Sequence, residues 1–367
     1  MGIHCPIIRE GDDLQQIVID SILRTTELED GDVIGITESV VARSQGNYVT
    51  VDEIAAETER LFGKLPIIQL YEPIYSRNRF AIILKGIARA CSAVIITMPE
   101  YDEVGNPRGV NPWTGVNIMD YYKKICKEER CDCIIDYDGV KFDDDERKLY
   151  ISLQKEIELE GSNILICNLH HFHEKKLELL AASKEFGIDS LTIHTLDEYF
   201  PGMCGYGLLG SNKATEEKVK LFPNITKAKD FVDTLQNKIF KLTGKLVQCM
   251  VYGDGAFKDP SAEIWEFADP VTTPAYTIGL EGSPNEIKIK AFADDKFAEL
   301  NGEELEEAIK KEIASKKSDL KGEMTSQGTT PRRYIDLLAS LMDLTSGSGD
   351  KGTPVVLVKN YFKNYSC

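Results

Sequence analysis

Short apolar runs alternate with amphipathic helical segments along most of this chain. Residues 33–36, 93–97 and 246–252 are apolar runs of the length typical of buried strands. Residues 52–63 and 226–243 place apolar side chains at helical spacing between such runs. Strands that alternate with helices are typical of proteins in which helices cover a sheet. The sequence therefore predicts an α/β fold.

Composition indicates the size class and excludes some partners. With 367 residues the chain is long enough for two or three domains, and 42% hydrophobic and 28% charged residues are ordinary for a globular protein. The formal net charge is −17, from 43 basic and 60 acidic residues. Such an acidic surplus disfavours a nucleic-acid backbone or an anionic membrane as the main partner. We therefore expect neither a nucleic-acid nor a membrane partner.

The distribution of apolar residues and cysteines indicates the compartment. Apolar runs such as residues 93–96 are far too short to span a bilayer, and residues 1–6 lack the basic stretch and apolar core of a secretory signal. The nine cysteines are odd in number and scattered, which favours reduced thiols over a disulfide framework. We expect a cytoplasmic protein.

A change of character near residue 98 indicates the domain organisation. Residues 101–113 are rich in Gly, Pro and Asn and are loop-forming. Beyond them, helical and strand patterns alternate again: we expect helices at 117–130, 145–160 and 173–186, and strands at 163–167 and 190–194. We interpret residues 98–205 as an inserted α/β subdomain, with residues 1–97 and 206–367 as the core.

A glycine- and hydroxyl-rich stretch precedes the last apolar run of the chain. Residues 344–354 contain three glycines and lead into the strand pattern of residues 355–358. Small residues let a backbone wrap closely around an anion, and its N–H groups supply hydrogen-bond donors. The stretch is not the common phosphate-binding loop, because Lys351 is followed by Gly352 and a strand, not by Ser or Thr and a helix. The alternative is a flexible connector.

Two other strand patterns end in polar residues. Residues 33–36 lead to Thr37, Glu38 and Ser39, with Arg43 in the helix that follows. Ligands in α/β folds usually bind where a strand ends and turns into a helix. The alternatives are that Ser39 caps the helix and that Arg43 is an ordinary surface cation.

The strand pattern at 246–252 runs into Gly253, Asp254 and Gly255. An aspartate between two glycines at the carboxyl end of a strand is well placed as a metal ligand, and Asp259 supplies a possible second oxygen. A plain Asp-Gly turn is the alternative.

Other residues allow a different chemistry. Arg77, Arg79, Lys85 and Arg89 form a basic group that could bind a carboxylate or phosphate, or pair with the surplus acids. Cys126, Cys131 and Cys133 lack the paired spacing of a zinc site. Cys167, His170 and His173 follow a strand pattern and are the candidate ligands of a metal hydrolase, with a polar helix-capping loop as the alternative.

Four segments together resemble the γ-glutamyl ligase family of the deazaflavin coenzyme F-420, which adds glutamate to F-420-0 using GTP. The four segments are Pro6-Ile-Ile-Arg9-Glu-Gly-Asp-Asp-Leu14, the strand–turn–helix at 31–46, the segment 242–254 that ends in Asp254, and Gly347-Ser-Gly-Asp-Lys-Gly-Thr-Pro-Val-Val356. The last is similar to the family's G-Q-x-D-E-G-I-P-V-V. The resemblance covers roughly residues 1–95 and 205–365.

The resemblance implies a mixed-sheet ligase fold, GTP as co-substrate, a divalent metal such as Mn²⁺ or Mg²⁺, a small anionic substrate and a possible homodimer. It implies catalytic roles for Arg43 and Asp254, and a metal at Asp254 with Asp259 as the second ligand. The implied nucleotide-binding residues are Arg9, Glu38, Ser39, Arg43, Ser346, Gly347, Ser348, Gly349, Asp350, Lys351, Gly352 and Thr353.

The chain departs from the family pattern at four places, one of which is the D-T-F-G-R-P-W-R segment, which becomes Asp254-Gly-Ala-Phe-Lys-Asp-Pro260. The family's A-N-A-G-I-D-x-S-N segment falls near residues 85–88, where the second metal-binding aspartate is missing. Its D-P-D-A-S-A stretch is reduced to residues 211–214, and its loop glutamine is Ser348. A relative that keeps the fold and binds a small ligand without catalysis is therefore the second hypothesis, and a metal hydrolase is the third.

Overall fold

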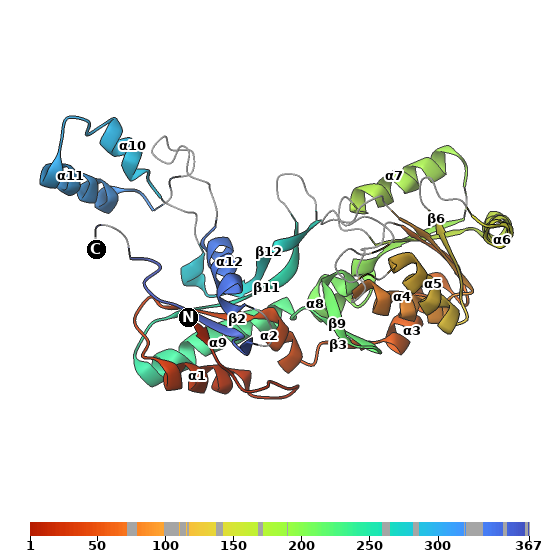
Figure 1. Cartoon of the computed structure of the whole chain (residues 1–367), viewed down its shortest axis with the longest axis horizontal. Helices are drawn as coiled ribbons and strands as arrows, with labels where there is room; N and C mark the ends of the chain where they lie inside the picture. The colour runs from red at the N-terminus through yellow and green to blue at the C-terminus, as the bar shows by residue number, and fades with distance from the viewer. Residues whose placement is uncertain are drawn as a thin grey trace. The chain divides into compact units, whose positions relative to one another are not determined.

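The chain forms two compact units, which we describe separately. The structure is a computed structural model that describes residues 1–71, 79–98, 110, 115, 117–136, 142–167, 172–188, 190–258, 265–281, 286–318, 320, 333–347, 351–363 and 366. Unit 1 comprises Met1–Ser44, Ile225–Gly255 and Ala268–Cys367, and unit 2 comprises Gln45–Asn224 and Ala256–Phe267. Figure 1 labels several helices and strands of each unit.

Unit 1 is organised around a mixed five-stranded sheet with the order β1-β13-β2-β11-β12. The strands are β1 (Gly2–Ile3), β2 (Val33–Thr37), β11 (Gln248–Lys258), β12 (Trp265–Tyr276) and β13 (Val355–Val358). β2 and β11 are parallel, whereas β13 is antiparallel to both β2 and β1. The expected α/β class and mixed sheet are confirmed.

Helices cover both faces of this sheet because its central strands are apolar on both sides. On one face, Ile34 and Ile36 of β2 pack with α1 (Leu14–Thr25) and α9 (Ile225–Thr243). On the other, Val33 packs with α12 (Tyr334–Ser346). Figure 1 shows α12 on the opposite side of β2 from α1 and α9. α2 (Glu38–Ser44) follows β2 directly.

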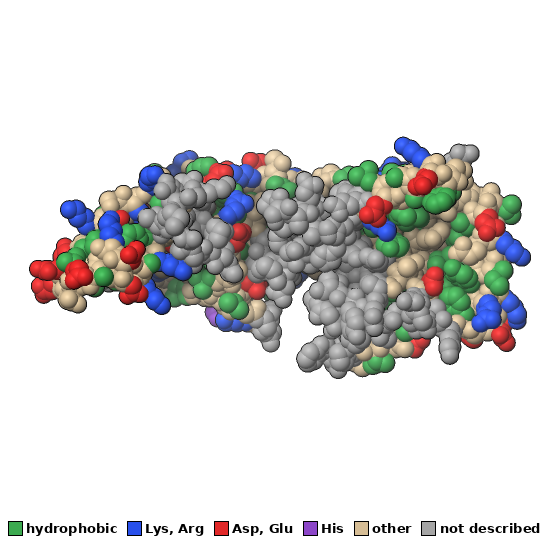
Figure 2. Space-filling model, turned by 90° about the horizontal axis from the view of Figure 1, so that it is seen from above, with side chains coloured by type: hydrophobic (Ala, Val, Ile, Leu, Met, Phe, Trp, Pro, Cys, Tyr) green, Lys and Arg blue, Asp and Glu red, His purple; other side chains and the backbone are tan. Residues whose placement is uncertain are grey.

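The rest of unit 1 is a pair of charged helices and a short turn. The helices are α10 (Ile289–Asp294) and α11 (Gly302–Ser315), and Lys296, which follows α10, forms an ion pair of 2.8 Å with Glu312 of α11. The turn η3 (Ile278–Leu280) follows β12. Figure 2 shows acidic and basic side chains gathered over these helices. None of the helices in the described part of the chain is both long and apolar enough to cross a membrane.

Unit 2 contains a parallel five-stranded sheet with the order β6-β5-β4-β7-β8. The strands are β4 (Ile67–Tyr71), β5 (Ala93–Thr97), β6 (Asp132–Asp136), β7 (Ser162–Ile166) and β8 (Leu191–Thr195). This is the strand order 3-2-1-4-5 of a doubly wound α/β fold. On one face Ile68 and Leu70 pack with α3 (Val51–Phe62), α4 (Arg79–Ala90) and α5 (Ile118–Glu128).

The other face packs against α6 (Asp144–Glu160) through Leu153 and Ile157, and α7 (Phe172–Glu185) leads into β8. A second, three-stranded sheet has the order β3-β10-β9, from β3 (Tyr48–Thr50), β9 (Ser211–Thr215) and β10 (Lys218–Leu221). Three short turns connect β8 to β9: η1 (Leu196–Glu198), α8 (Pro201–Cys204) and η2 (Gly207–Gly210).

The boundaries of unit 2 differ from the predicted domain boundaries. β4 and β5 pair with each other, and with β7 and β6 respectively, so residues 67–97 share one sheet with residues 132–195. The compact unit therefore begins at Gln45 instead of at residue 98. Whether residues 98–205 were inserted into an older core stays a prediction.

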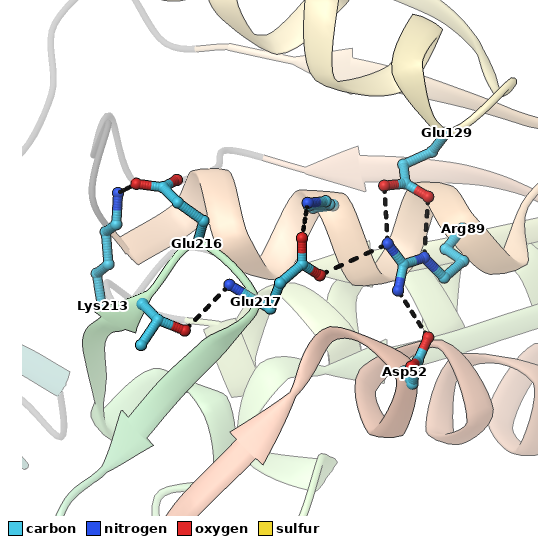
Figure 3. A network of polar contacts seen from close by, with 8 residues as sticks. Asp52, Arg89, Glu129, Lys213, Glu216 and Glu217 are labelled. Atoms are coloured by element: carbon cyan, nitrogen blue, oxygen red, sulfur yellow. Dashed lines mark hydrogen bonds and ion pairs between the residues drawn. The ribbon is translucent and has the colours of Figure 1, made fainter.

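A network of charged side chains surrounds Arg89 on α4 (Figure 3). Its guanidinium makes two hydrogen bonds of 2.9 Å to the Glu129 carboxylate, and a third of 2.6 Å to Asp52 on α3. Glu217, between β9 and β10, lies 3.7 Å from Arg89 and also pairs with Lys85. The hydrogen bonds that Arg89 donates to the carboxylates of Glu129 and Asp52 raise the pKa of Arg89. Lys85 and Arg89 thus pair with the surplus acids.

A second polar cluster lies at the end of β8. Glu198 accepts hydrogen bonds from Lys176 at 2.6 Å and from Thr195 at 3.1 Å, and lies 2.5 Å from Nδ1 of His194. Burial raises the pKa of Glu198, but the contacts with His194 and Lys176 outweigh burial, so the pKa is lowered. The carboxylate is therefore held in its ionised form.

Candidate functional site

A cavity of about 380 Å³ opens in unit 1, where three distant segments of the chain meet. The N-terminal segment, the end of β2 with α2, and the segment between α12 and β13 each form one wall. The lining residues are Cys5, Pro6, Ile7, Ile8, Thr37, Ser39, Val40, Arg43, Ser346, Gly347, Gly352, Thr353 and Pro354. The volume lies in the range of small-molecule sites in proteins.

Backbone hydrogen bonds hold the three walls together. The N–H of Thr37 donates to the carbonyl oxygen of Pro354 at 2.9 Å, which joins the end of β2 to the start of β13. The N–H of Cys5 donates to the carbonyl oxygen of Gly352 at 3.2 Å. The N–H of Gly11 donates to the carbonyl oxygen of Ser44 at 3.4 Å, joining the N-terminal segment to α2. The outline of the cavity therefore depends on main-chain contacts.

The glycine-rich segment begins as a helix end that its own residues close. Gly347 has a φ of +66°, which favours glycine, and its N–H donates to the carbonyl oxygen of Asp343 at 3.2 Å. The Ser346 hydroxyl donates to the same carbonyl oxygen at 2.9 Å. The Thr353 hydroxyl donates to the carbonyl oxygen of Ser346 at 2.9 Å. These bonds bring the two described ends of the segment together.

Arg43 supplies the positive charge of the lining. Its side chain is exposed and makes no ion pair with any residue that the structure describes. The exposed hydroxyl-bearing residue Ser39 lies on the same wall, one helical turn earlier. Lys351 does not line the cavity, because its ammonium group donates to the carbonyl oxygen of Thr345 at 2.9 Å. An unpaired guanidinium beside hydroxyl groups suits a carboxylate or phosphate ligand.

Glu38 follows β2, whereas Asp254 lies within the neighbouring parallel strand β11, which continues to Lys258 instead of ending at residue 252 as the sequence predicted. Tyr252 of β11 pairs with Thr37 of β2, so the next residues of both strands continue at the same edge of the sheet. Glu38 is buried, and a Cβ at Gly253 would lie 2.6 Å from its Cγ. The glycine therefore gives the Glu38 side chain its space directly before Asp254. Glu38 thus lies beside the backbone of Gly253, and its carboxylate is of the kind that suits Mg²⁺ or Mn²⁺.

Tyr252 lies behind the cavity wall and was not predicted as a site residue. Its side chain is 1% exposed, and its hydroxyl makes no hydrogen bond to any described group. Burial raises the pKa of Tyr252 to about 12, while the nearby Ser346 hydroxyl acts in the opposite direction. The hydroxyl therefore stays protonated at neutral pH and can donate a hydrogen bond.

Many of the residues predicted for the site line the cavity. They are Ser39, Arg43, Ser346, Gly347, Gly352 and Thr353. Arg9 does not line it, because its N–H donates to Asp12 in a turn and the wall is formed by the four residues Cys5–Ile8 instead. Ser348, Gly349, Asp350 and Asp259 lie outside the described residues, as does the side chain of Asp254. Nucleotide and metal binding by these residues stay predictions.

The described residues do not support a metal site among the cysteines and histidines of unit 2. Among them, no group of three or more His, Cys, Asp or Glu side chains is arranged to hold a metal ion. Cys126 is buried, and the thiols of Cys131 and Cys133 raise its pKa, which disfavours the thiolate that a metal requires. Cys167 is also buried, with its pKa raised by burial. His170 and the side chain of His173 lie outside the described residues.

Comparison with known families extends the resemblance found in four segments to nearly the whole chain. The sequence profile described as F420-0:Gamma-glutamyl ligase matches residues 2–360, including the residues 98–205 that the four segments leave out. A search among curated proteins finds no individual relative that matches. A match of this extent confirms the expected family. The chain belongs to the F420-0:gamma-glutamyl ligase family.

Proposed function

We propose that this protein is a nucleotide- and metal-dependent ligase that joins an amino acid, glutamate or another, to a small acidic acceptor, with GTP as the co-substrate. Membership in the family supports an amide-forming ligase. The proposal that the ligase uses a nucleotide rests on the cavity, because the predicted anion-binding residues Ser39 and Arg43 line it together with both ends of the glycine-rich segment.

The proposed reaction has two steps. An acceptor carboxylate oxygen attacks the terminal phosphorus of GTP, the bond to the bridging oxygen breaks, and GDP leaves with that electron pair. The amino nitrogen of the amino acid then attacks the acyl phosphate, phosphate leaves, and the nitrogen loses a proton as the amide forms. In-line phosphoryl transfer requires positioning and charge stabilisation more than covalent help from the protein.

Arg43 is assigned to the phosphate oxygens. Its guanidinium has no described acidic partner, so its charge is available to a ligand, and its planar donors match two oxygens at once. Backbone N–H groups of the glycine-rich segment are assigned to the same phosphates, since small residues allow a close approach.

The residues assigned to a divalent metal are Asp254, with Asp259 as the second ligand, and the buried Glu38 lies beside the backbone that leads to Asp254. Mn²⁺ or Mg²⁺ held there would neutralise charge on the transferred phosphoryl group. A homodimer and a cytoplasmic location belong to the same proposal.

One observation favours a second function, the binding of a small ligand without ligation. Ala88 falls in the segment where the family carries its second metal-binding aspartate, and it is fully buried in the core of unit 2. The carboxylate is absent there and the position is closed to solvent. A protein with an incomplete metal site would bind a nucleotide and fail to transfer its phosphoryl group.

The test is binding and turnover of the same purified protein. Calorimetry with GTP is performed with and without Mn²⁺, and release of phosphate is measured with glutamate and an acidic acceptor such as F-420-0. A ligase binds GTP more tightly with metal and releases phosphate only with both substrates. Binding without phosphate release favours the second function, and no GTP binding in either condition refutes the nucleotide assignment.

Two variants assign the residues. Asp254→Asn should abolish metal-dependent turnover while the folded protein remains, as judged by circular dichroism. Arg43→Met should weaken GTP binding by about 10- to 100-fold, since a charge-assisted hydrogen bond contributes about 1.5–3 kcal/mol. Arg24→Met is the matched control, because Arg24 is an exposed arginine of unit 1 that lies outside the cavity lining. Full turnover by Asp254→Asn would exclude Asp254 as the metal ligand.

A further inference from the structure

The ring of Tyr252 extends from the sheet toward the C-terminal end of α12. Tyr252 belongs to the core cluster that also contains Met342 of α12. A Cβ at Gly35 of β2 would lie 3.0 Å from Cδ1 of Tyr252 and 2.9 Å from Cε of Met342. Gly35 therefore leaves the space in which the tyrosine ring and the last turns of α12 pack together.

The hydroxyl of Tyr252 lies next to Ser346, which is one helical turn beyond Met342. Ser346 lines the cavity, whereas Tyr252 does not, so the tyrosine stands directly behind the wall. The Ser346 hydroxyl donates its proton to the carbonyl oxygen of Asp343 at 2.9 Å, and in this arrangement its oxygen accepts no hydrogen bond from Tyr252.

The arrangement without a ligand is energetically unfavourable for a tyrosine. A buried hydroxyl with no hydrogen-bond partner carries a desolvation cost, and phenylalanine would fill the same space without it. The Tyr252 hydroxyl is such a group within the described residues. A ligand that rearranges the hydrogen bonds of Ser346 would remove this cost.

We propose that Tyr252 is a positioning residue that supports Ser346 as a donor to an anionic ligand in the cavity. When a phosphate oxygen of the ligand lies beside Ser346, the serine O–H turns from Asp343 to that oxygen, and the Tyr252 O–H donates to the serine oxygen. The chain of donors runs from Tyr252 through Ser346 to the ligand. The inference rests on the proposed function for its ligand, a nucleotide phosphate.

The negative charge of the ligand strengthens both hydrogen bonds, from Tyr252 to Ser346 and from Ser346 to the ligand. A hydrogen bond to an anion polarises the serine hydroxyl, which makes its oxygen a better acceptor for the tyrosine proton. The Tyr252 hydroxyl therefore stabilises the liganded state more than the ligand-free state, and this difference appears as affinity.

The experiment compares Tyr252→Phe with wild type by calorimetry and thermal unfolding, using GTP with Mn²⁺, pyrophosphate and inorganic phosphate as probes. We expect a 3- to 10-fold loss of affinity for the phosphate-bearing probes and no decrease in the melting temperature of the ligand-free protein. Ser346→Ala should lower affinity as well, and the double variant should bind no more weakly than Ser346→Ala alone.

Tyr199→Phe in unit 2 is the matched control. Tyr199 is equally buried, but its hydroxyl is hydrogen-bonded to Thr58 at 3.1 Å. This variant should lower the melting temperature and leave the affinity of the cavity unchanged, which is the opposite pattern to that expected of Tyr252→Phe.

Each outcome decides the inference. Equal affinities of wild type and Tyr252→Phe would overturn it and leave the nucleotide proposal standing. If the protein bound pyrophosphate or phosphate but not GTP, the nucleotide proposal would be refuted. The role of Tyr252 would then be tested by the ratio of the affinities of wild type and Tyr252→Phe for the probe that binds. A ligand-free Tyr252→Phe protein as destabilised as Tyr199→Phe would show that the hydroxyl is already partnered. No binding of any probe by wild type would refute both.

Discussion

Arg89→Met tests how far unit 2 depends on the charged network of Figure 3. The substitution keeps most of the apolar length of the side chain and removes its charge. Arg89 joins α4 to α3, to Glu129 after α5 and to the β9–β10 turn, so its loss releases contacts with three other parts of the unit. We expect a destabilised but folded protein.

The magnitude follows from the exposure of each partner. The Glu129 side chain is 13% exposed, whereas Asp52 and Glu217 are 83% and 61% exposed. Exposed pairs contribute about 0.2–1 kcal/mol each. A largely buried carboxylate that loses its bidentate arginine is left as an unpaired charge, which lowers the stability of the fold by about 2–3 kcal/mol. Glu129 therefore accounts for most of the expected loss.

The assay is thermal unfolding followed by a probe of unit 2, because the two units need not unfold together. A loss of about 2–3 kcal/mol lowers the melting temperature of a domain of this size by about 4–12 °C. Asp52→Ala is the matched control, since it removes the most exposed partner, and should shift the midpoint by less than about 4 °C.

A double-mutant cycle separates the contributions further. Arg89→Met and Glu129→Gln should be strongly non-additive, because each removes the same bidentate contact. The cycle of Arg89→Met with Asp52→Ala should be close to additive. Equal effects of Arg89→Met and Asp52→Ala would refute the reasoning, because burial would then not determine the strength of these pairs.

The remaining predictions concern the core, the pH dependence and the site. Gly35→Ala should destabilise unit 1 by about 1–3 kcal/mol in urea unfolding, because the new Cβ meets the flexible end of Met342, and Met342→Ala should partly restore it. Unit 2 should lose stability as the pH falls through the folded-state pKa of Glu198, because that pKa is lowered and the carboxylate stabilises the fold only while it is ionised. In thermal unfolding, Glu198→Gln should show a weaker dependence of the melting temperature on pH. Gly253→Ala should weaken Mn²⁺ binding in calorimetry more than it lowers the melting temperature, because its Cβ would displace Glu38 beside Asp254. Unchanged metal affinity in Gly253→Ala would separate Glu38 from the metal site.

The helices were predictable because their sequences carry their own periodicity and caps. The segment predicted at 226–243 is α9 (Ile225–Thr243), and that at 145–160 is α6 (Asp144–Glu160). The Asp143 side chain accepts hydrogen bonds from two N–H groups of the first turn of α6, which fixes its start locally.

Strand pairing was not predictable in the same way, because it joins distant residues. Nothing in residues 67–71 indicates that they pair with residues 93–97 on one side and 163–166 on the other. The change of composition at residue 98 was interpreted as a domain boundary, but composition reports loops and not sheet membership. The doubly wound sheet of unit 2 appears only once the pairing is known.

The site was predictable where its residues are unusual for their position. A glycine-rich segment before a strand and an arginine after a strand end both signal anion binding, and both contribute to the cavity lining. The wall formed by residues 5–8 and the hydroxyl of Tyr252 carry no such signal. Ile7 and Ile8 resemble any apolar residues, and a buried tyrosine in a strand is usually part of the core. What distinguishes Tyr252 is that its hydroxyl has no hydrogen-bond partner among the residues that the structure describes.

The departures from the family pattern have unequal consequences because the cavity is built from main-chain bonds. The bonds from Thr37 to Pro354 and from Cys5 to Gly352 involve no side chain, so the loop serine that replaces the family's glutamine leaves these described contacts in place. Metal coordination is more sensitive to substitution, because each carboxylate side chain coordinates the metal directly. Under the proposed function, loss of the acid near Ala88 affects phosphoryl transfer, whereas the loop departure affects how tightly a nucleotide is held and which nucleotide is preferred. Nucleotide affinity and turnover should accordingly vary independently among variants of this chain.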